Sequence, residues 1–229
     1  MLNEAPGLPA LLHTLAAGFP NAERIVVDGG SLDASVVTAM PLADVVLVGE
    51  RGRARQMNLG AAAARGEILC FLHADSCPDF TEVAFWAAIG TQTSWGFCRV
   101  HLAGERRALA VISQFMNWRS RLSAIATGDQ MLFVERGLYE AMNGFADIPL
   151  MEDVEICARL RRRARPAALA LTVHSSGRRW EEQGVVPTVL RMWALRFAFW
   201  LGVPAQRLWN HYYGKSALQC AAKYRAGDG

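Results

Sequence analysis

The first third of the chain alternates between two hydrophobic periods. Leucines at positions 8, 11, 12 and 15 recur at helical spacing, whereas the short apolar runs at 24–28, 44–48 and 68–72 have the length of strands. The small residues after Asp33 and the alanine-rich segment 56–65 predict helices between these runs. Helix and strand therefore alternate three times, a pattern typical of a mostly parallel mixed sheet covered by helices.

The strand predicted at 68–72 ends at a polar tip. Its continuous apolar run favours a strand buried on both faces, and His73 and Asp75 follow it directly. Ligands in open α/β sheets bind just beyond the carboxyl ends of the strands, so Asp75 is a candidate site residue. The alternative is that Asp75 caps the helix expected from Thr81 or orders the turn formed by the residues after it.

The middle of the chain continues the α/β pattern. We expect strands at 95–102, 131–134 and 168–173, and helices at 109–123, 137–142 and from the loop 147–153 to about residue 163. Glu152 and Asp153 begin the last of these helices, where acidic side chains also complement the positive helix end. The polar loop 127–130 is interpreted either as part of a binding site or as a structural turn.

The segment 185–214 is apolar and aromatic, but Arg191 and Arg196 interrupt it, so it falls short of a membrane-spanning helix. We therefore expect a domain at 1–184 and an amphipathic helical appendage at 185–229. The appendage either packs on its own domain, makes peripheral contact with a membrane surface, or forms a homodimer.

Composition limits the functional classes. With 229 residues, 52% hydrophobic and 20% charged, the chain suits one large globular domain. Its net charge of +3 is modest, yet basic residues cluster at 51–55, 159–165 and 178–179, which fits anionic ligands or membrane surfaces. The sequence has no zinc-finger spacing and no recognition-helix pattern, which argues against nucleic acid as the partner.

The five cysteines are odd in number and scattered, which favours free thiols in the cytoplasm. Cys70, His73 and Cys77 have a spacing that suggests zinc, but no matching second pair follows them. Polar Asn3 and Glu4 and then Pro6 lie within the first six residues, so no signal peptide is predicted. We expect a cytoplasmic protein, with the inner membrane as its one candidate surface for peripheral attachment.

Five short motifs occur in a fixed order: Asn3-Glu4, Asp28-Gly29-Gly30-Ser31, His73-Ala74-Asp75, Gly128-Asp129-Gln130 and Glu152-Asp153. In this order, over roughly residues 2–214, they resemble family 2 glycosyltransferases of the GT-A fold. The runs RGRARQMNLGAAAARG, FLHADS and IPLMEDVE look like those of a bacterial subgroup linked to arsenosugar biosynthesis and radical-SAM gene neighbourhoods. The resemblance implies a GT-A-like fold whose first strand, normally placed before Asn3, is missing or truncated.

The resemblance also implies a nucleotide-sugar donor site. Asp75 matches the last residue of the family's Asp-x-Asp, a ligand of Mg²⁺ or Mn²⁺ on the donor diphosphate, and His73 occupies the place of the first Asp. Asp28 matches a residue that contacts the base or ribose, although the family commonly has a second Asp where this chain has Gly29. Further residues expected around the donor are Asn3, Glu4, Gly30, Arg53, Arg55, Gln56 and Asn58.

On the acceptor side, Asp153 matches the general base of inverting members, with Glu152 as a supporting carboxylate. Asp129 and Gln130 are expected to line the acceptor site, and Arg179 and Trp180 to border the acceptor or the diphosphate. These residue types suit the chemistry, because a metal and arginines can neutralise a leaving diphosphate while a partly desolvated carboxylate takes the acceptor proton. Direct displacement at the anomeric carbon then needs no protein nucleophile.

Two alternatives remain open at this point. A nucleotidyltransferase shares the sheet and a metal-binding Asp, but usually carries a glycine-rich basic loop after its first strand, which this sequence lacks. A non-catalytic binding or partner subunit with a degraded donor site is favoured by Gly29, His73 and the expected loss of the first strand.

Overall fold

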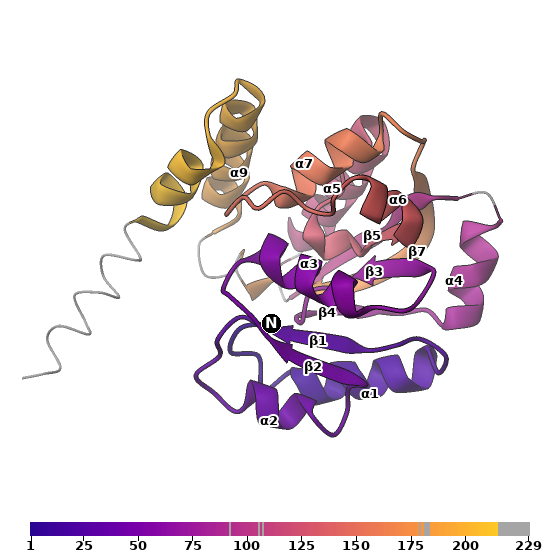
Figure 1. Cartoon of the computed structure of the whole chain (residues 1–229). Helices are drawn as coiled ribbons and strands as arrows, with labels where there is room; N and C mark the ends of the chain where they lie inside the picture. Colours follow the sequence, from indigo (N-terminus) through magenta and orange to yellow (C-terminus); the bar gives the residue numbers. More distant parts are fainter. Residues whose placement is uncertain (92, 105, 107, 179, 181–183, 215–229) are drawn as a thin grey trace, which may run out of the picture.

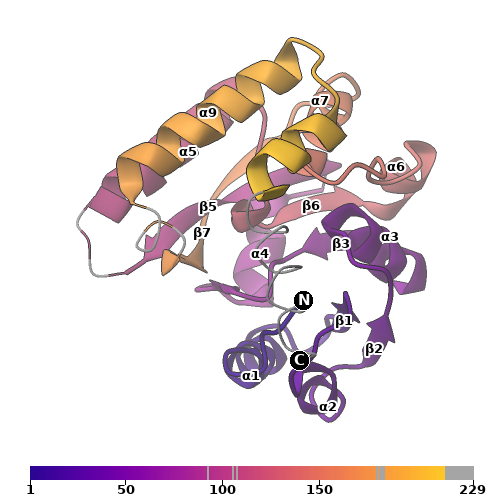
Figure 2. The same cartoon turned by 90° about the vertical axis from the view of Figure 1, so that its left-hand side faces the viewer.

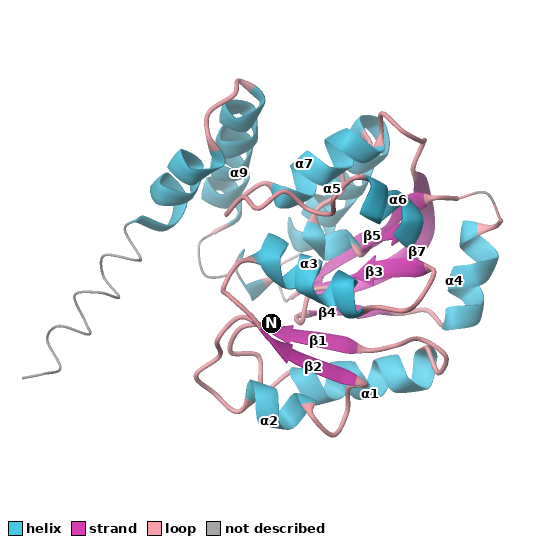
Figure 3. Ribbon diagram, viewed as in Figure 1, coloured by secondary structure: helices cyan, strands magenta, loops and turns pink. Residues whose placement is uncertain are grey.

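Short helices and strands succeed one another along most of the chain, as the computed structural model shows (Figures 1 and 3). The structure describes residues 1–91, 93–104, 106, 108–178, 180 and 184–214. The helices are α1 (Leu8–Gly18), α2 (Ser35–Ala39), α3 (Arg53–Ala63), α4 (Glu82–Ile89), α5 (Ala108–Ser123), the 3-10 helix η1 (Gly128–Gln130), α6 (Arg136–Ala141), α7 (Glu152–Leu160) and α9 (Val185–Trp200). The strands are β1 (Ile25–Asp28), β2 (Val45–Val48), β3 (Ile68–Phe71), β4 (Ser76–Pro78), β5 (Trp95–Ala103), β6 (Leu132–Glu135) and β7 (Ala167–Ser176).

The strands form two sheets. One contains β1 and β2 in parallel, and the other has the order β3-β6-β5-β7-β4. In the larger sheet only β5 and β7 run parallel, whereas β3–β6, β5–β6 and β4–β7 are antiparallel. The prediction of a mixed sheet is confirmed, but parallel pairing does not dominate it, because β6 is inserted antiparallel between β3 and β5.

Helix α3 connects the two sheets. A Cβ at Gly60 would lie only 3.1 Å from the Val27 side chain, so glycine lets α3 approach β1 closely. The same helix contributes Ala54 and Met57 to the core that contains Leu69 of β3. Small residues along α3 therefore allow one helix to pack against both β1 and the larger sheet.

The first residue pairs with β1. The Met1 amino group donates to the Val27 carbonyl (2.6 Å), and the Gly29 N–H donates to the Met1 carbonyl (3.0 Å). This is the hydrogen-bond pattern of a parallel pair. The Gln56 amide of α3 donates to the Met1 and Val27 carbonyls, at 3.0 and 3.1 Å, and so connects this pair to the helix.

Two local predictions around β3 are wrong, and the alternative of Asp75 as a helix cap is excluded. Within β3 only Leu69 is buried, and Cys70 is exposed because β3 is an edge strand. The residues Ser76–Pro78, which we expected to turn the chain, form β4 and pair with β7. Helix α4 is capped by Thr81, whose hydroxyl accepts from the Ala84 N–H (3.4 Å), so Asp75 is not its cap.

The larger sheet is buried between helices. Trp95, Phe97 and Phe133 are almost fully inaccessible, and the Trp95 indole N–H donates to the Ala164 carbonyl (2.8 Å). Burial of these aromatic side chains is the largest apolar contribution of the sheet to folding. The four cysteines that the structure describes are free thiols.

Helix α9 and the helical residues 205–214 lie beside α5 and α7 (Figure 2). Met151, Leu195, Leu208 and Tyr212 are buried together where these elements meet. The appendage predicted at 185–229 thus packs on the rest of the chain as far as it is described. None of the described helices combines the length and the apolar character needed to cross a bilayer.

Candidate active site

A cavity of about 290 Å³ lies between α5, α9 and the polar ends of β4 and β7. Acidic, basic and aromatic side chains all reach it. Its polar and aromatic lining includes Asp75, Asp129, Arg119, Arg178, Arg196, Phe115, Trp180 and Trp193. A cavity of this size with a few charged groups among aromatic walls is suited to a small organic substrate.

Asp75 and Asp129 reach this cavity from different parts of the chain. Asp75 follows β3 and is held by the Ser176 N–H, which donates to its carbonyl (3.1 Å). Asp129 lies in η1, where its carboxylate accepts from the Ser175 hydroxyl (3.3 Å). Strand β7 therefore fixes the segments that carry both predicted carboxylates.

His73 lies against η1. Its Nδ1 is 3.5 Å from the Asp129 carboxylate, and a Cβ at Gly128 would come within 2.2 Å of its ring. Glycine at position 128 thus allows the imidazole to pack on the η1 backbone. The residue in the place of the family's first acid consequently contacts the Asp129 loop.

Glu4 approaches the same region from the start of the chain. Its carboxylate lies 3.8 Å from the Arg178 guanidinium. Burial and the negative charge of Asp75 raise the pKa of Glu4, while Arg178 lowers it to a smaller extent. The structure therefore brings Glu4, Asp75 and Arg178 together, although 174 positions separate the first from the last (178 − 4 = 174).

Glu152 and Asp153 border a second, smaller cavity of about 20 Å³, which is room for about one water molecule. His73 and Gly128 also line it, and Thr127 lines both cavities. The Glu152 side chain is 5% exposed and lies 3.9 Å from the Arg53 guanidinium. Asp153 accepts backbone hydrogen bonds from Gly128 (3.3 Å) and Val154 (2.7 Å).

Burial raises the pKa of both carboxyl groups in this pair, and the adjacent charge of Asp153 raises that of Glu152 further. Arg53 and His73 act in the opposite direction on both. Two neighbouring carboxylates in a largely desolvated place favour retention of a proton by the pair. Such a pair can accept a proton near neutral pH, which exposed carboxylates do poorly.

Several residues expected around the donor hold loops in the described structure. The Asp28 carboxylate accepts from the Gly30 and Ser31 N–H groups, each at 2.8 Å, and from the Ser31 hydroxyl. Burial alone would raise the pKa of Asp28, but these hydrogen bonds outweigh it and lower the pKa. Asn3 joins the same loop, because its side-chain oxygen accepts from the Leu32 N–H (2.8 Å).

The polar residues at the start of α3 make contacts in different parts of the protein. Only Arg53 reaches the carboxyl pair, whereas Arg55 forms an exposed, bidentate ion pair with Asp147 (2.8 and 3.0 Å) and also contacts Glu50. Gln56 connects Met1 to β1, and a Cβ at Gly29 would collide with its amide at 2.8 Å. Gly29 is thus needed for close packing on α3.

Asn58 and Gln130 also act inside the protein. Asn58 donates to the Phe145 carbonyl (2.9 Å) and accepts from the Phe145 N–H (2.9 Å) and the Tyr139 hydroxyl (2.5 Å). Gln130 is 1% exposed, and its side-chain oxygen accepts from the Ser120 hydroxyl (2.7 Å). Both amides position loops that carry other candidate residues. Trp180 is partly buried and lines the larger cavity, while the predicted Arg179 lies outside the described residues.

Two arginines of the larger cavity were not predicted as site residues. Among the buried side-chain nitrogen and oxygen atoms that the structure describes, only Arg119 Nε and Arg196 Nε have no hydrogen-bond partner. A buried polar atom without a partner costs free energy unless a ligand satisfies it. Arg196 interrupts an apolar stretch of the sequence, whereas Arg119 lies among polar residues of α5 and carries no such signal.

The described residues contain no group of three or more His, Cys, Asp and Glu side chains arranged to hold a metal ion alone. Mg²⁺ and Mn²⁺ bound together with a substrate phosphate commonly need only one or two protein carboxylates. Asp75, which is exposed at the larger cavity, fits that mode of binding. The site therefore suits a metal ion that binds together with a diphosphate, and it does not suit a metal ion held by protein ligands alone.

One family model and several solved structures are similar to this chain. The sequence model described as Glycosyl transferase family 2 matches residues 1–84, which include Asp28 and Asp75. No curated protein matches the chain at the level of sequence.

Solved glycosyltransferases share the architecture. A mannosyltransferase from Pyrobaculum calidifontis, in complex with GDP-Man and Mn²⁺, is similar with a TM-score of 0.57 and 19% identity over 86% of this chain and 59% of its own. TarS 1-349 from S. aureus, in complex with UDP, gives 0.56 and 16% over 77% of this chain and 58% of its own. Glucosyl-3-phosphoglycerate synthase from Mycobacterium tuberculosis, with Mn²⁺ and UDP-Glc, gives 0.53 and 18% over 77% and 67%.

The likeness establishes the fold. The mixed sheet with covering helices is that of the GT-A architecture, so the fold predicted from the sequence is confirmed. The chain spans 59% of the mannosyltransferase and 58% of TarS 1-349.

Proposed function

We propose that the chain is a family 2 glycosyltransferase that moves a sugar from a nucleoside-diphosphate donor to an acceptor hydroxyl with inversion at the anomeric carbon. One observation carries the proposal: two cavities that share Thr127 bring together Asp75 and Asp129 on one side and the Glu152–Asp153 pair on the other. The family match over residues 1–84 and structural neighbours solved with GDP-Man, UDP or UDP-Glc support it.

The donor side is assigned to Asp75, Arg178 and Arg53. A divalent metal bound by Asp75 and the donor phosphates would neutralise charge on the leaving nucleoside diphosphate. Arg178 lies beside Glu4 near Asp75, and Arg53 lies beside Glu152, so each can orient a phosphate oxygen by a charge-assisted hydrogen bond.

The acceptor side is assigned to Asp153. Its carboxylate accepts the proton of the attacking hydroxyl, while the Gly128 N–H keeps one carboxylate oxygen in place. Glu152 holds the neighbouring negative charge and helps to raise the proton affinity of the pair. Displacement by the activated hydroxyl inverts the sugar, and no covalent protein intermediate is required.

Arg119 and Arg196 indicate the chemistry of the acceptor. Their unpaired Nε atoms belong to side chains that line the larger cavity, together with Phe115 and Trp193. A substrate with an anionic group beside an apolar part would satisfy both arginines and contact the aromatic walls. We therefore assign the α5 and α9 wall of the larger cavity to an anionic, amphipathic acceptor, while Asp75 and Arg178 of the same cavity face the donor. We also propose that the chain belongs to the bacterial subgroup linked to arsenosugar biosynthesis and radical-SAM gene neighbourhoods, which its sequence motifs resemble.

Donor binding provides the test. Titration of the full chain with UDP and GDP, with and without Mn²⁺, should give metal-dependent binding of one nucleotide, measured by calorimetry. Asp75→Asn should reduce the Mn²⁺-dependent gain at least about tenfold, because it removes the protein's ligand to the metal. Asp79→Asn is the matched control, since Asp79 is exposed beyond β4 and contacts His174 at 3.3 Å.

A non-catalytic binding subunit is the second candidate, because His73 stands in the place of an acid and contacts Asp129. Nucleotide binding without any donor hydrolysis or transfer would favour that candidate. Failure of both nucleotides to bind in the presence of Mn²⁺ would contradict the donor site itself.

A further inference from the structure

Large apolar side chains are exposed in two parallel rows on neighbouring helices. On α5 the row recurs at helical spacing, and on α9 the spacing is the same. The rows consist of Val111, Phe115, Trp118 and Leu122 on α5, and Val186, Leu190, Trp193, Phe197 and Trp200 on α9, followed by Leu201 at its end. Trp193, Phe197 and Trp200 remain 55%, 61% and 78% exposed, which is unusual for side chains of this size.

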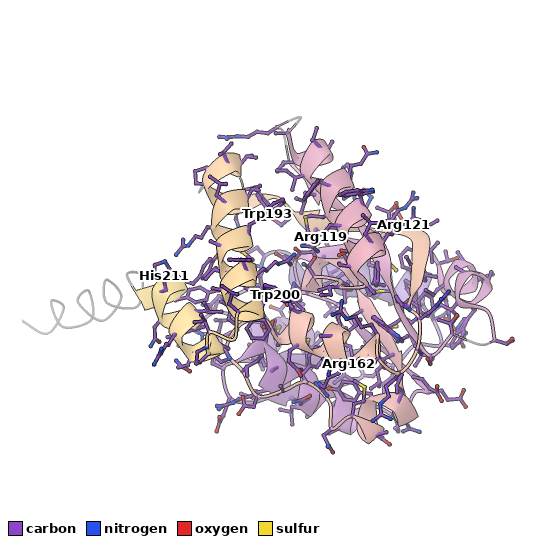
Figure 4. All side chains as sticks on the ribbon, turned by 90° about the horizontal axis from the view of Figure 1, so that it is seen from above. Arg119, Arg121, Arg162, Trp193, Trp200 and His211 are labelled. Carbon is purple, nitrogen blue, oxygen red and sulfur yellow. The ribbon has the colours of Figure 1, made fainter. Side chains whose placement is uncertain are left out.

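The two rows form one surface, which we call the aromatic face. The rings of Phe115 and Trp193 stack across the two helices with their centroids 5.7 Å apart. Phe115 also contacts Trp118, and Phe197 contacts Trp200, at 6.0 Å in each case. Figure 2 shows α9 running along α5, and Figure 4 shows Trp193 and Trp200 following one another along α9.

The segments that carry the aromatic face have charged side chains of one sign. Neither α5, nor α9, nor the segment 201–214 contains an aspartate or a glutamate. On these segments Arg121 and Arg207 are exposed and Arg191 lies over the Tyr212 ring, whereas Arg119 and Arg196 line the larger cavity. The nearest acidic residues along the chain, Glu105, Glu181 and Glu182, lie outside the described residues.

We propose that the aromatic face docks on a membrane surface that contains anionic phospholipids. Exposed Trp and Phe side chains favour the interface between headgroups and acyl chains, and the arginines attract the negative headgroups. None of the described helices is long and apolar enough to span a bilayer, so the helices would lie along the surface. A second copy of the chain fits the face less well, because a two-fold contact would bring the arginines of both copies together.

Docking in this way would have a consequence for the site. Phe115 and Trp193 belong both to the aromatic face and to the wall of the larger cavity. An amphipathic acceptor could therefore enter the cavity from the lipid surface. This consequence rests on the proposed function, whereas the docking itself can be tested without any donor or acceptor.

Co-sedimentation with vesicles tests the docking. The full chain should sediment with vesicles of phosphatidylcholine and phosphatidylglycerol, and much less with phosphatidylcholine alone. Added salt should weaken the binding, because it screens the arginines. The double variant Phe197→Glu/Trp200→Glu should lower the partition coefficient at least about tenfold, since it removes two interfacial aromatic groups. Neither residue lines the larger cavity.

Trp86→Glu is the matched control. Trp86 is 49% exposed on α4, which lies on the other side of the molecule from α9 (Figure 1), so its replacement should leave vesicle binding unchanged. Arg121→Gln should lower binding to the anionic vesicles severalfold, whereas Arg51→Gln, in the loop before α3, should not. Circular dichroism and thermal unfolding would establish that each variant is folded.

Sedimentation that the double variant leaves unchanged would overturn the proposal, as would failure of the chain to bind either kind of vesicle. A dimer seen by analytical ultracentrifugation, dissociated by the double variant and insensitive to vesicles, would assign the face to self-association instead. Loss of vesicle binding with intact nucleotide binding would leave the proposed transferase activity untouched.

Discussion

The roles of individual residues depend on which other groups they contact. Asp28 and Asp75 both end or follow a strand, yet the first is 1% exposed and bonded to its own loop, while the second is exposed at a cavity. The same residue type in a similar sequence position therefore serves a loop in one case and faces solvent in the other. The two roles differ because the two carboxylates differ in burial and in hydrogen-bond partners. Neither property can be read directly from the sequence.

Asp153→Asn tests the assignment of the base. The amide retains the shape of the carboxyl group but cannot accept the acceptor proton, so turnover should fall by about 10²–10⁴. Nucleotide affinity should stay within about twofold, because Asp153 does not contact the donor in this proposal. Transfer or donor hydrolysis, followed together with calorimetry, separates the two effects. Wild-type turnover in the variant would remove Asp153 from this role.

Glu152→Gln addresses the dependence of stability on pH. Because the folded protein raises the pKa of this carboxyl group, the folded state binds more protons than the unfolded state at intermediate pH. The stability of the wild type should therefore decrease as pH rises from the ordinary carboxyl range through the raised pKa. Glutamine removes this loss, so the variant should gain roughly 1–3 kcal/mol at pH 8.

Chemical denaturation at pH 5 and pH 8 would measure this effect. The advantage of Glu152→Gln over the wild type should shrink at the lower pH, where the wild-type carboxyl group is protonated in the folded state. Glu140→Gln, an exposed substitution on α6, is the control and should show little pH dependence. An equal gain at both pH values would contradict a raised pKa.

At the scale of elements, the loops are positioned by a few polar side chains on helices. Asn58 of α3 uses both ends of its amide to hold the turn around Phe145 and the hydroxyl of Tyr139. Burial raises the pKa of Tyr139, so its hydroxyl remains a hydrogen-bond donor at neutral pH. This arrangement keeps Phe145, which borders the smaller cavity, against the core.

Asn58→Ala should destabilise the protein by about 2–4 kcal/mol, because it leaves the Phe145 backbone and the Tyr139 hydroxyl without partners. Denaturant unfolding would measure the change. Asn21→Ala is the control, since Asn21 makes only an exposed side-chain contact with Glu82 (3.4 Å) and should change stability by less than about 0.5 kcal/mol. A loss no larger than that of the control would contradict a structural role for Asn58.

Element order was predictable from the sequence, because each helix and strand has its own period. The strands at 24–28, 44–48 and 95–102 and the helices at 8–15 and 109–123 were all found close to their predicted places. Strand β4 was missed, since three residues with a proline read as a turn and only pairing with β7 makes them a strand. The exposure of Cys70 was missed for a related reason, because an apolar run does not reveal that its strand lies at an edge.

The candidate site was predictable only in part. Asp75, Asp129, Glu152 and Asp153 were singled out as motifs, and the structure gathers them around adjoining cavities. Arg119 and Arg196 were not, since only the structure shows that their Nε atoms are buried without a hydrogen-bond partner. Proximity between distant segments arises from the pairing of β7 with β4 and β5, which the local pattern does not specify.

On the scale of the whole molecule, the apolar helical surface and the polar site face a common cavity. The wall formed by α5 and α9 is aromatic, while β4, β7 and η1 contribute carboxylates and hydroxyls. A substrate with one polar and one apolar end would be oriented by this asymmetry before any chemistry takes place. Under the two proposals made above, the wall that selects the acceptor is also the wall that contacts the lipid surface.

The division of the strands into two sheets has a further consequence for motion. The layer of β1, β2, α1 and α2 has its own small core around Leu8, Leu12 and Ala39, and it shares no strand pairing with the larger sheet among the described residues. Its connections include α3, the Gln56 hydrogen bonds and the ring contact of Phe19, after α1, with Phe80. We therefore expect this layer to open locally at a lower free-energy cost than the larger sheet. A nucleotide that contacts both layers would favour the closed state of this layer. Part of its binding free energy would be spent on that closure.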